Sequence, residues 1–158
     1  MITLQPGDKA PMFSGTDQNG NVVSLKEFRG KKVALFFYPE DDTPTCTEQI
    51  CNLRDNFMLL KNHKFEVIGI SPDDAASHKK FETKFKLPFT LIADPSRKIL
   101  NKYGVWGEKL MFGNRYMGVH RTTFVIDEKG KVTRIFLRPK VKDHAGEIIR
   151  SVENQKLT

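Results

Sequence analysis

Hydrophobic residues fall along the chain in short runs that predict a buried β-sheet. Three runs rich in β-branched and aromatic residues are too short for helices and predict central strands, at 32–38, 65–71 and 89–93. Segments 120–126 and 131–138 flank the polar step Asp127-Glu128-Lys129-Gly130 and predict a hairpin. An Asn-Gly step within residues 17–21, followed by Val22-Val23, predicts a second hairpin near the N-terminus.

Apolar residues recur at helical spacing between Ile50 and Leu60. They predict a helix from Pro44 to about Asn62, with Thr43 as its N-cap. A single helical turn is expected after the capping box at residues 24–27. Further helices are expected to start at three places that offer a capping residue: Ser71-Pro72, Asp94-Pro95 and Asp143. The segment from Gly104 to Gly118 is predicted to be irregular.

This order of elements predicts an α/β fold of one domain that spans residues 1–158. Strands alternate with helices before a terminal hairpin and helix, which favours a mixed central sheet with helices on both faces and an N-terminal β-hairpin. A thioredoxin-like arrangement satisfies that order. The chain contains no internal repeat, linker or low-complexity tract that would divide it.

Composition and charge indicate an ordinary soluble protein. Hydrophobic residues make up 39% and charged residues 28% of the chain, and the longest apolar run, 33–38, is far too short to cross a bilayer. The first residues lack the pattern of a signal peptide, so we expect a cytoplasmic protein without a membrane partner. The net charge of +7 comes from scattered lysines, so nucleic-acid binding is not expected.

The two cysteines are the candidate chemical groups. Cys46 occupies the third position of the helix that Thr43 is expected to cap, and first-turn amides together with the helix dipole stabilise a negative sulfur there. The Thr43 hydroxyl lies one turn earlier and can reach the sulfur or a substrate oxygen. Pro39 offers no competing amide hydrogen and can shield the sulfur from water. We therefore expect a sheltered thiolate at Cys46.

Cys51 follows five residues later on the same predicted helix. Ideal helix geometry places the two α-carbons roughly 8.6 Å apart, whereas a disulfide requires about 4.4–6.8 Å. A bond between these cysteines would therefore require the start of the helix to unwind. The spacing predicts a reduced folded form and an oxidised, locally unfolded form.

The two cysteines could also have a structural or metal-binding role instead of a catalytic one. Cysteine is among the most buried residue types, so two inert core thiols would fit the same positions. A metal pair is disfavoured, because five-residue spacing on one helix does not match the usual ligand spacing, and the four histidines are scattered. Neither a metal nor a cofactor is expected.

The stretch Phe37-Tyr38-Pro39-Glu40-Asp41-Asp42-Thr43-Pro44-Thr45-Cys46-Thr47 resembles the active-site signature of peroxiredoxins. Cys51 is similar to the second cysteine of the bacterioferritin comigratory protein, or peroxiredoxin Q, subfamily. The resemblance continues to Gly118-Val119-His120-Arg121-Thr122-Thr123-Phe124 and so covers nearly the whole chain. Two positions depart from the subfamily: Thr45 replaces a common glycine, and Glu40 replaces a frequent lysine.

The resemblance implies a thiol peroxidase that acts on hydrogen peroxide or organic hydroperoxides. In that family the residues at Cys46, Thr43, Pro39 and Arg121 form the peroxide site, and the residue at Cys51 closes an intramolecular disulfide. The implied reductant is thioredoxin or a similar dithiol protein. Because resolution within one chain needs no second subunit, we expect a monomer.

Two rival functions fit a thioredoxin-like fold. A protein disulfide oxidoreductase is disfavoured, because its Cys-x-x-Cys pair at a helix start is absent. A redox sensor or binding module could use the same pair of cysteines without efficient turnover, and the fold alone does not exclude it.

Overall fold

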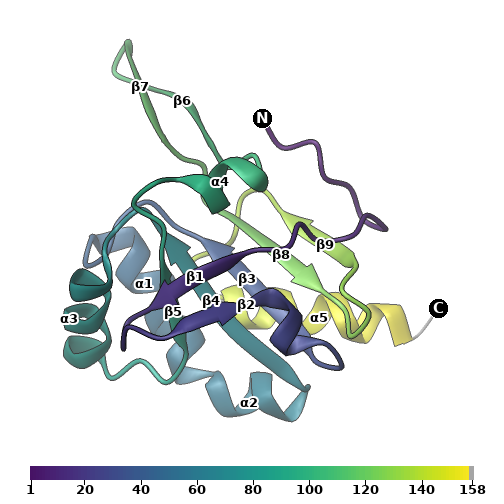
Figure 1. Ribbon diagram of the computed structural model, residues 1–158. Coiled ribbons are helices and arrows are strands. Elements are labelled where there is room, and N and C mark those ends of the chain that lie inside the picture. Colours follow the sequence, from purple (N-terminus) through teal and green to yellow (C-terminus); the bar gives the residue numbers. More distant parts are fainter. Residues whose placement is uncertain (157–158) are drawn as a thin grey trace.

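The computed structural model describes residues 1–156 (Figure 1). The strands are β1 (Ser14–Asp17), β2 (Val22–Ser24), β3 (Lys32–Phe37), β4 (Phe65–Ser71), β5 (Thr90–Ala93), β6 (Trp106–Met111), β7 (Asn114–Val119), β8 (Thr122–Ile126) and β9 (Val132–Phe136). The helices are the 3₁₀ turn η1 (Leu25–Phe28) and the α-helices α1 (Pro44–Asp55), α2 (Phe57–Asn62), α3 (Ala75–Phe85), α4 (Lys98–Lys102) and α5 (His144–Lys156).

Seven strands form one mixed sheet in the order β2-β1-β5-β4-β3-β8-β9. β3 lies in its interior, parallel to β4 and antiparallel to β8, and the N-terminal hairpin β1–β2 forms one edge (Figure 1). The register pairs Phe37 with Thr122, so the end of β3 lies beside the start of β8. That pairing fixes the place where the chain leaves the sheet for α1.

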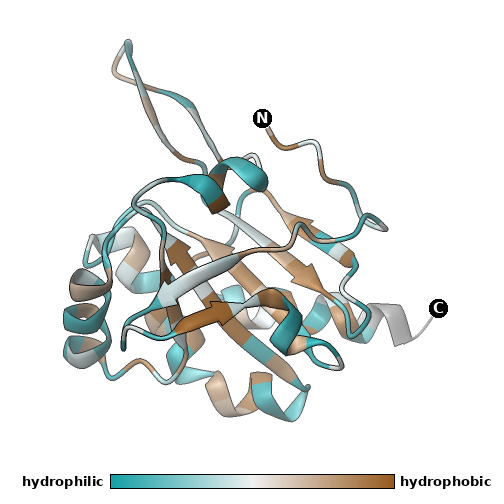
Figure 2. Cartoon of the chain, viewed as in Figure 1, coloured by the Kyte–Doolittle hydropathy of each residue, from teal (hydrophilic) through white to brown (hydrophobic). Residues whose placement is uncertain are grey.

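Both faces of the sheet are covered, which explains the continuous apolar run of β3. Ala34, Phe36 and Tyr38 pack into a layer with α1, α2, α3 and α5. The alternate residues, from Val33 to Phe37, pack with η1, α4 and the N-terminal segment on the other face. Figure 2 shows the hydrophobic central strands between more polar helices. The predicted mixed sheet with helices on both faces is confirmed.

Three helices begin or end at other residues than predicted. The long helix breaks at Asn56, whose backbone leaves the helical region (φ −110°, ψ 17°) and whose side-chain amide donates to the Asn52 carbonyl. α3 begins after Asp74, which accepts from the Ser77 amide, so Ser71 is not its cap. α4 begins only at Lys98. A local side-chain hydrogen bond sets the first two boundaries, whereas α4 follows Arg97, whose backbone is left-handed (φ 62°).

The prediction of an irregular segment at 104–118 was wrong. β6 and β7 form a two-stranded hairpin that pairs with no other strand and projects from the body of the molecule (Figure 1). Most of its side chains are exposed, including Phe112 at the tip. With no buried face, the hairpin has no need of the alternating apolar pattern that reveals a half-buried strand.

The last helix, α5, begins directly after Asp143, and its Ile148, Ile149 and Val152 are buried as expected. None of the helices in the described part of the chain combines the length and apolar character that a bilayer span requires.

Candidate active site

The site forms where β3 ends and α1 begins. The loop of residues 38–43 leads into Pro44, and the first helical hydrogen bond runs from the Thr47 amide to the Thr43 carbonyl (2.8 Å). The amides of Thr45 and Cys46 therefore lie in the first turn without an intrahelical acceptor. They give this end of α1 a partial positive charge.

Cys46 lies in this first turn with its side chain directed into the protein. The residue is only 1% exposed and its thiol is free. The Nη2 of Arg121 donates to its Sγ at 3.1 Å. Although 75 positions separate the two residues, the pairing of Phe37 with Thr122 brings them together at the carboxyl end of β3. The structure thus places a guanidinium on the candidate nucleophile.

Gln49 is a buried polar residue that the sequence interpretation missed. Its Oε1 accepts from Nη1 of Arg121 (2.5 Å), so one guanidinium contacts both the sulfur and this amide. The Gln49 Nε2 is buried, and the described part of the chain offers it no hydrogen-bond partner. A polar residue three positions after Cys46, on the same helix face, was the signal that could have revealed it.

One further cationic group, Lys109, lies near the site. Lys109 reaches it from the β6–β7 hairpin, and its Nζ donates to the Val119 carbonyl at 3.0 Å. Burial lowers the pKa of Lys109, the positive charge of Arg121 lowers it further, and Cys46 acts in the opposite direction. The hairpin that the sequence did not predict therefore carries a cation to the neighbourhood of Cys46 and Arg121.

His144 of α5 is buried behind the site. Its Nε2 is 2.7 Å from Thr123 Oγ1 and its Nδ1 is 2.9 Å from Glu147 Oε1. Burial is the main cause that lowers the pKa of His144, with a smaller contribution from Arg121 and an opposing one from Glu147. A neutral ring that donates from Nδ1 and accepts at Nε2 satisfies both partners.

Thr43 occupies the predicted N-cap position, but its hydroxyl makes no bond to the helix. Oγ1 donates instead to the Glu40 carbonyl at 3.0 Å. The oxygen lone pairs remain available to accept a hydrogen bond. Pro39 is half-buried between β3 and α1, while the side chains of Glu40 and Thr45 are exposed.

Cys51 lies further along the same continuous helix and is half-buried, with a free thiol. Burial raises its pKa above the ordinary thiol value, Arg54 opposes this, and Asp55 adds to it. Both thiols are free in an intact α1.

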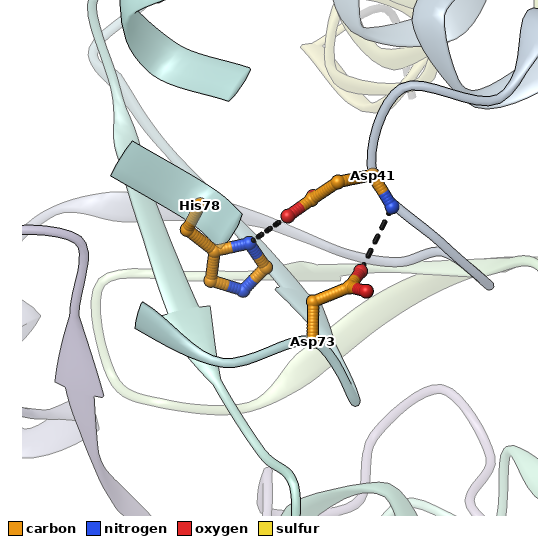
Figure 3. A group of neighbouring side chains, drawn as sticks. All are labelled: Asp41, Asp73 and His78. Atoms are coloured by element: carbon orange, nitrogen blue, oxygen red, sulfur yellow. Dashed lines mark hydrogen bonds and ion pairs between the residues drawn. The ribbon is translucent and has the colours of Figure 1, made fainter. Parts of the chain in front are cut away.

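One group of potential metal ligands lies near the same loop. Asp41, Asp73 and His78 bring their donor atoms within 4.8 Å of one another (Figure 3). The donor atoms are engaged with one another and with neighbouring hydroxyl and backbone groups through hydrogen bonds. The cluster is thus a hydrogen-bonded network and does not form part of the cysteine site.

The arrangement around Cys46 suits nucleophilic attack by sulfur. Positive charge from a guanidinium and from helix amides favours a thiolate, and the same donors can stabilise negative charge that develops on an oxygen bound next to it. Reduction of a bond between two oxygens requires both effects at one place.

Comparison with known proteins agrees with this chemistry. Residues 6–135 match the AhpC/TSA family. The chain is 43% identical over 144 residues to peroxiredoxin Bcp of Escherichia coli K12, which covers 91% of this chain and 92% of the relative. The fold matches the crystal structure of peroxidoxin BcpB from Mycobacterium tuberculosis with a TM-score of 0.84 at 29% identity, over 96% and 97% of the two chains.

A mutant of Xylella fastidiosa PrxQ shares the fold at a TM-score of 0.91, over 99% of both chains, although the sequences are only 22% identical. The family match, the Escherichia coli relative and the thiol site agree. The chain belongs to the AhpC/TSA family and is a thiol peroxidase of the peroxiredoxin type.

Proposed function

We propose that Cys46 is the nucleophile that attacks hydrogen peroxide or an organic hydroperoxide. The observation that carries this proposal is the bond from Arg121 Nη2 to Cys46 Sγ, at a helix start and out of bulk water. An arginine held in this position favours the thiolate.

In the first step the Cys46 thiolate attacks the terminal oxygen of the hydroperoxide. The O–O bond breaks as the S–O bond forms, and the departing oxygen takes a proton to leave as water or an alcohol. Arg121 and the amide of Cys46 stabilise the charge that moves onto oxygen. Thr43, whose hydroxyl hydrogen is directed to the Glu40 carbonyl, accepts a hydrogen bond from the peroxide. Pro39 shields the reacting atoms.

In the second step Cys51 captures the Cys46 sulfenic acid. The thiol of Cys51 attacks the oxidised sulfur, water leaves, and an intramolecular disulfide forms before a second peroxide can oxidise Cys46 further. The folded α1 holds the two residues too far apart for this bond. Unwinding of the helix start is therefore part of each turnover.

In the third step thioredoxin or a similar dithiol protein reduces the disulfide. The chain lacks a Cys-x-x-Cys pair of its own, so the two electrons come from a separate protein. We further propose that the protein functions as a single-domain monomer in the cytoplasm, without nucleic-acid or membrane partners. The monomer is supported by the place of both cysteines on one helix, which makes a second subunit unnecessary for disulfide formation.

A peroxidase assay coupled to thioredoxin and its reductase tests the proposal. Cys46→Ser abolishes peroxide consumption, whereas Cys51→Ser supports about one turnover and then stops. Steady turnover by the Cys46 variant would contradict the assignment. If the parent protein forms its disulfide but no dithiol donor sustains turnover, the chain is a redox sensor and the proposed enzymatic cycle is wrong.

A further inference from the structure

A buried carboxylate fixes the loop that leads into α1. The side chain of Asp41 is only 4% exposed. It accepts three hydrogen bonds: from the Tyr38 hydroxyl (2.6 Å), the Ser77 hydroxyl (2.8 Å) and the His78 Nδ1 (2.7 Å). Figure 3 shows the histidine of α3 facing this carboxylate. The loop is thereby attached to α3 through its side chain.

The backbone of the same residue is also held. The amide of Asp41 donates to Asp73 Oδ2 at 2.8 Å, and the Ser71 hydroxyl donates to the same oxygen at 2.6 Å. Asp73 lies in the turn between β4 and α3. One residue of the loop is therefore fixed at two points by segments that are more than 30 positions away in sequence.

The hydrogen-bond partners indicate that these contacts are charge-assisted. His78 Nε2 faces the Ile92 carbonyl at 3.1 Å, which can only accept, so Nε2 carries a hydrogen. Nδ1 faces a carboxyl oxygen of Asp41 at 2.7 Å, so one hydrogen lies between these two atoms. The Tyr38 hydroxyl stays protonated, because burial, followed by Asp41, raises its pKa well above the ordinary value. The Asp41 carboxyl group is thus held by His78 and by two hydroxyl groups.

We propose that Tyr38, Asp41, Ser77 and His78, here called the Asp41 latch, set the balance between the folded and the unwound start of α1. This inference rests on the cycle proposed above, in which the helix must open for Cys51 to reach Cys46. Asp41 lies two residues before the N-cap Thr43 and five before Cys46. Unwinding that pulls on this loop has to break the latch.

The latch has opposite effects on the two chemical steps. When it is closed, it keeps Cys46 beside Arg121 and favours attack on peroxide. When it opens, the helix start is free to unwind and Cys51 can form the disulfide. The four residues are positioning residues, since they touch neither peroxide nor sulfur. A weaker latch therefore accelerates disulfide formation at the expense of the peroxide step.

Asp41→Asn tests this inference, with Asp42→Asn as the matched control. Asp42 is the next residue in the same loop, but it is exposed and forms only a surface ion pair with Lys84 (2.7 Å). Rapid-quench mass spectrometry of the reduced protein mixed with peroxide separates the sulfenic acid from the disulfide. The peroxide concentration that drives half of Cys46 to sulfinic acid is measured in parallel.

We expect disulfide formation to be about tenfold faster or more in Asp41→Asn. The substitution removes a charge-assisted hydrogen bond that is present only when the start of α1 is folded. The peroxide concentration that converts half of Cys46 to sulfinic acid rises in the same proportion. The rate of attack on peroxide falls or is unchanged. Asp42→Asn behaves as the parent. General damage to the fold would slow both steps, so the opposite direction of the two changes identifies the latch.

If Asp41→Asn does not fold, Tyr38→Phe and Ser77→Ala each remove one hydroxyl bond to the same carboxylate and give smaller changes in the same direction. Unchanged disulfide rates in all variants that fold, with a parent that forms the disulfide, would overturn the latch alone. A parent that forms no Cys46–Cys51 disulfide would overturn the proposed function instead. The two failures are therefore distinguishable.

Discussion

At the scale of single residues, the geometry of one guanidinium organises the site. Arg121 uses Nη2 for the Cys46 sulfur and Nη1 for the Gln49 amide oxygen. Because the guanidinium is planar and rigid, the bond to Gln49 also aims the second nitrogen at sulfur. Positive charge alone would not reproduce that direction. Gln49, which is fully buried, thus supports the orientation of Arg121 without contacting substrate.

Arg121→Lys therefore slows the peroxide step by about tenfold or more, since lysine keeps the charge but loses the planar fork. Stopped-flow kinetics at increasing peroxide concentration measure the second-order rate constant directly. Arg115→Lys, at an exposed position of the β6–β7 hairpin that pairs with Glu108, is the control and leaves the rate unchanged. An equal rate in parent and Arg121→Lys would remove Arg121 from the site.

At the scale of elements, close packing between β3 and β4 positions the active-site loop. A β-carbon on Gly69 of β4 would lie 2.5 Å from the ring of Phe36, which stacks on Tyr38 (5.6 Å between centroids). Tyr38 in turn donates to Asp41 in the loop. The absence of a side chain at Gly69 therefore allows the aromatic pair to pack and helps to hold the end of β3.

Gly69→Ala forces Phe36 out of place and lowers the free energy of unfolding by about 1–3 kcal/mol, the usual cost of overpacking. Urea denaturation measures this as a lower midpoint with an unchanged slope. Gly107→Ala in β6 is the control, because its added carbon would meet nothing closer than His120 at 3.4 Å. Equal midpoints for Gly69→Ala and the parent would contradict the packing argument.

The elements also show how far sequence patterns determine this fold. Central strands could be predicted because both of their faces are buried, which leaves continuous apolar runs. The β6–β7 hairpin could not, because exposed strands carry no such pattern, and Lys109 was missed with it. The break at Asn56 depends on one side-chain bond to the Asn52 carbonyl, and the apolar stripe continues across it.

In the candidate site, residues close together in the sequence could be predicted, whereas contacts between distant segments could not. Cys46, Cys51, Thr43 and Pro39 lie within one local segment, so spacing and helix geometry made them candidates before any family resemblance was considered. Arg121 was identified only through family resemblance, because its contact with Cys46 depends on the register between β3 and β8. The bond between Asp41 and His78 joins two elements in the same way and left no local signal.

At the scale of the whole molecule, the buried His144 links the sheet to α5. It lies between Thr123 of β8 and Glu147 of α5, and burial is the main cause that lowers its pKa from 6.5. The unfolded chain binds a proton at this histidine at a higher pH than the folded protein does. The stability that neutral His144 contributes is therefore complete above about pH 6.5 and is lost as the pH falls toward its folded-state pKa.

His144→Gln removes this titration, so its free energy of unfolding falls less steeply than that of the parent between about pH 7.5 and about pH 5. Urea denaturation at several pH values measures the two slopes. His120→Gln, at an exposed position, keeps the slope of the parent. Identical slopes for the parent and His144→Gln would mean that His144 is not held neutral in the folded protein.

Turnover depends on the Cys46 sulfur, which takes oxygen from peroxide, and on the Cys51 thiol, which removes that oxygen. The most direct measurement is intact-mass spectrometry of reduced Cys51→Ser after one equivalent of peroxide, with peptide mapping of the product. We expect one added oxygen, located on Cys46, at the rate at which peroxide disappears. Peroxide loss without oxygen on Cys46 would contradict this role of Cys46.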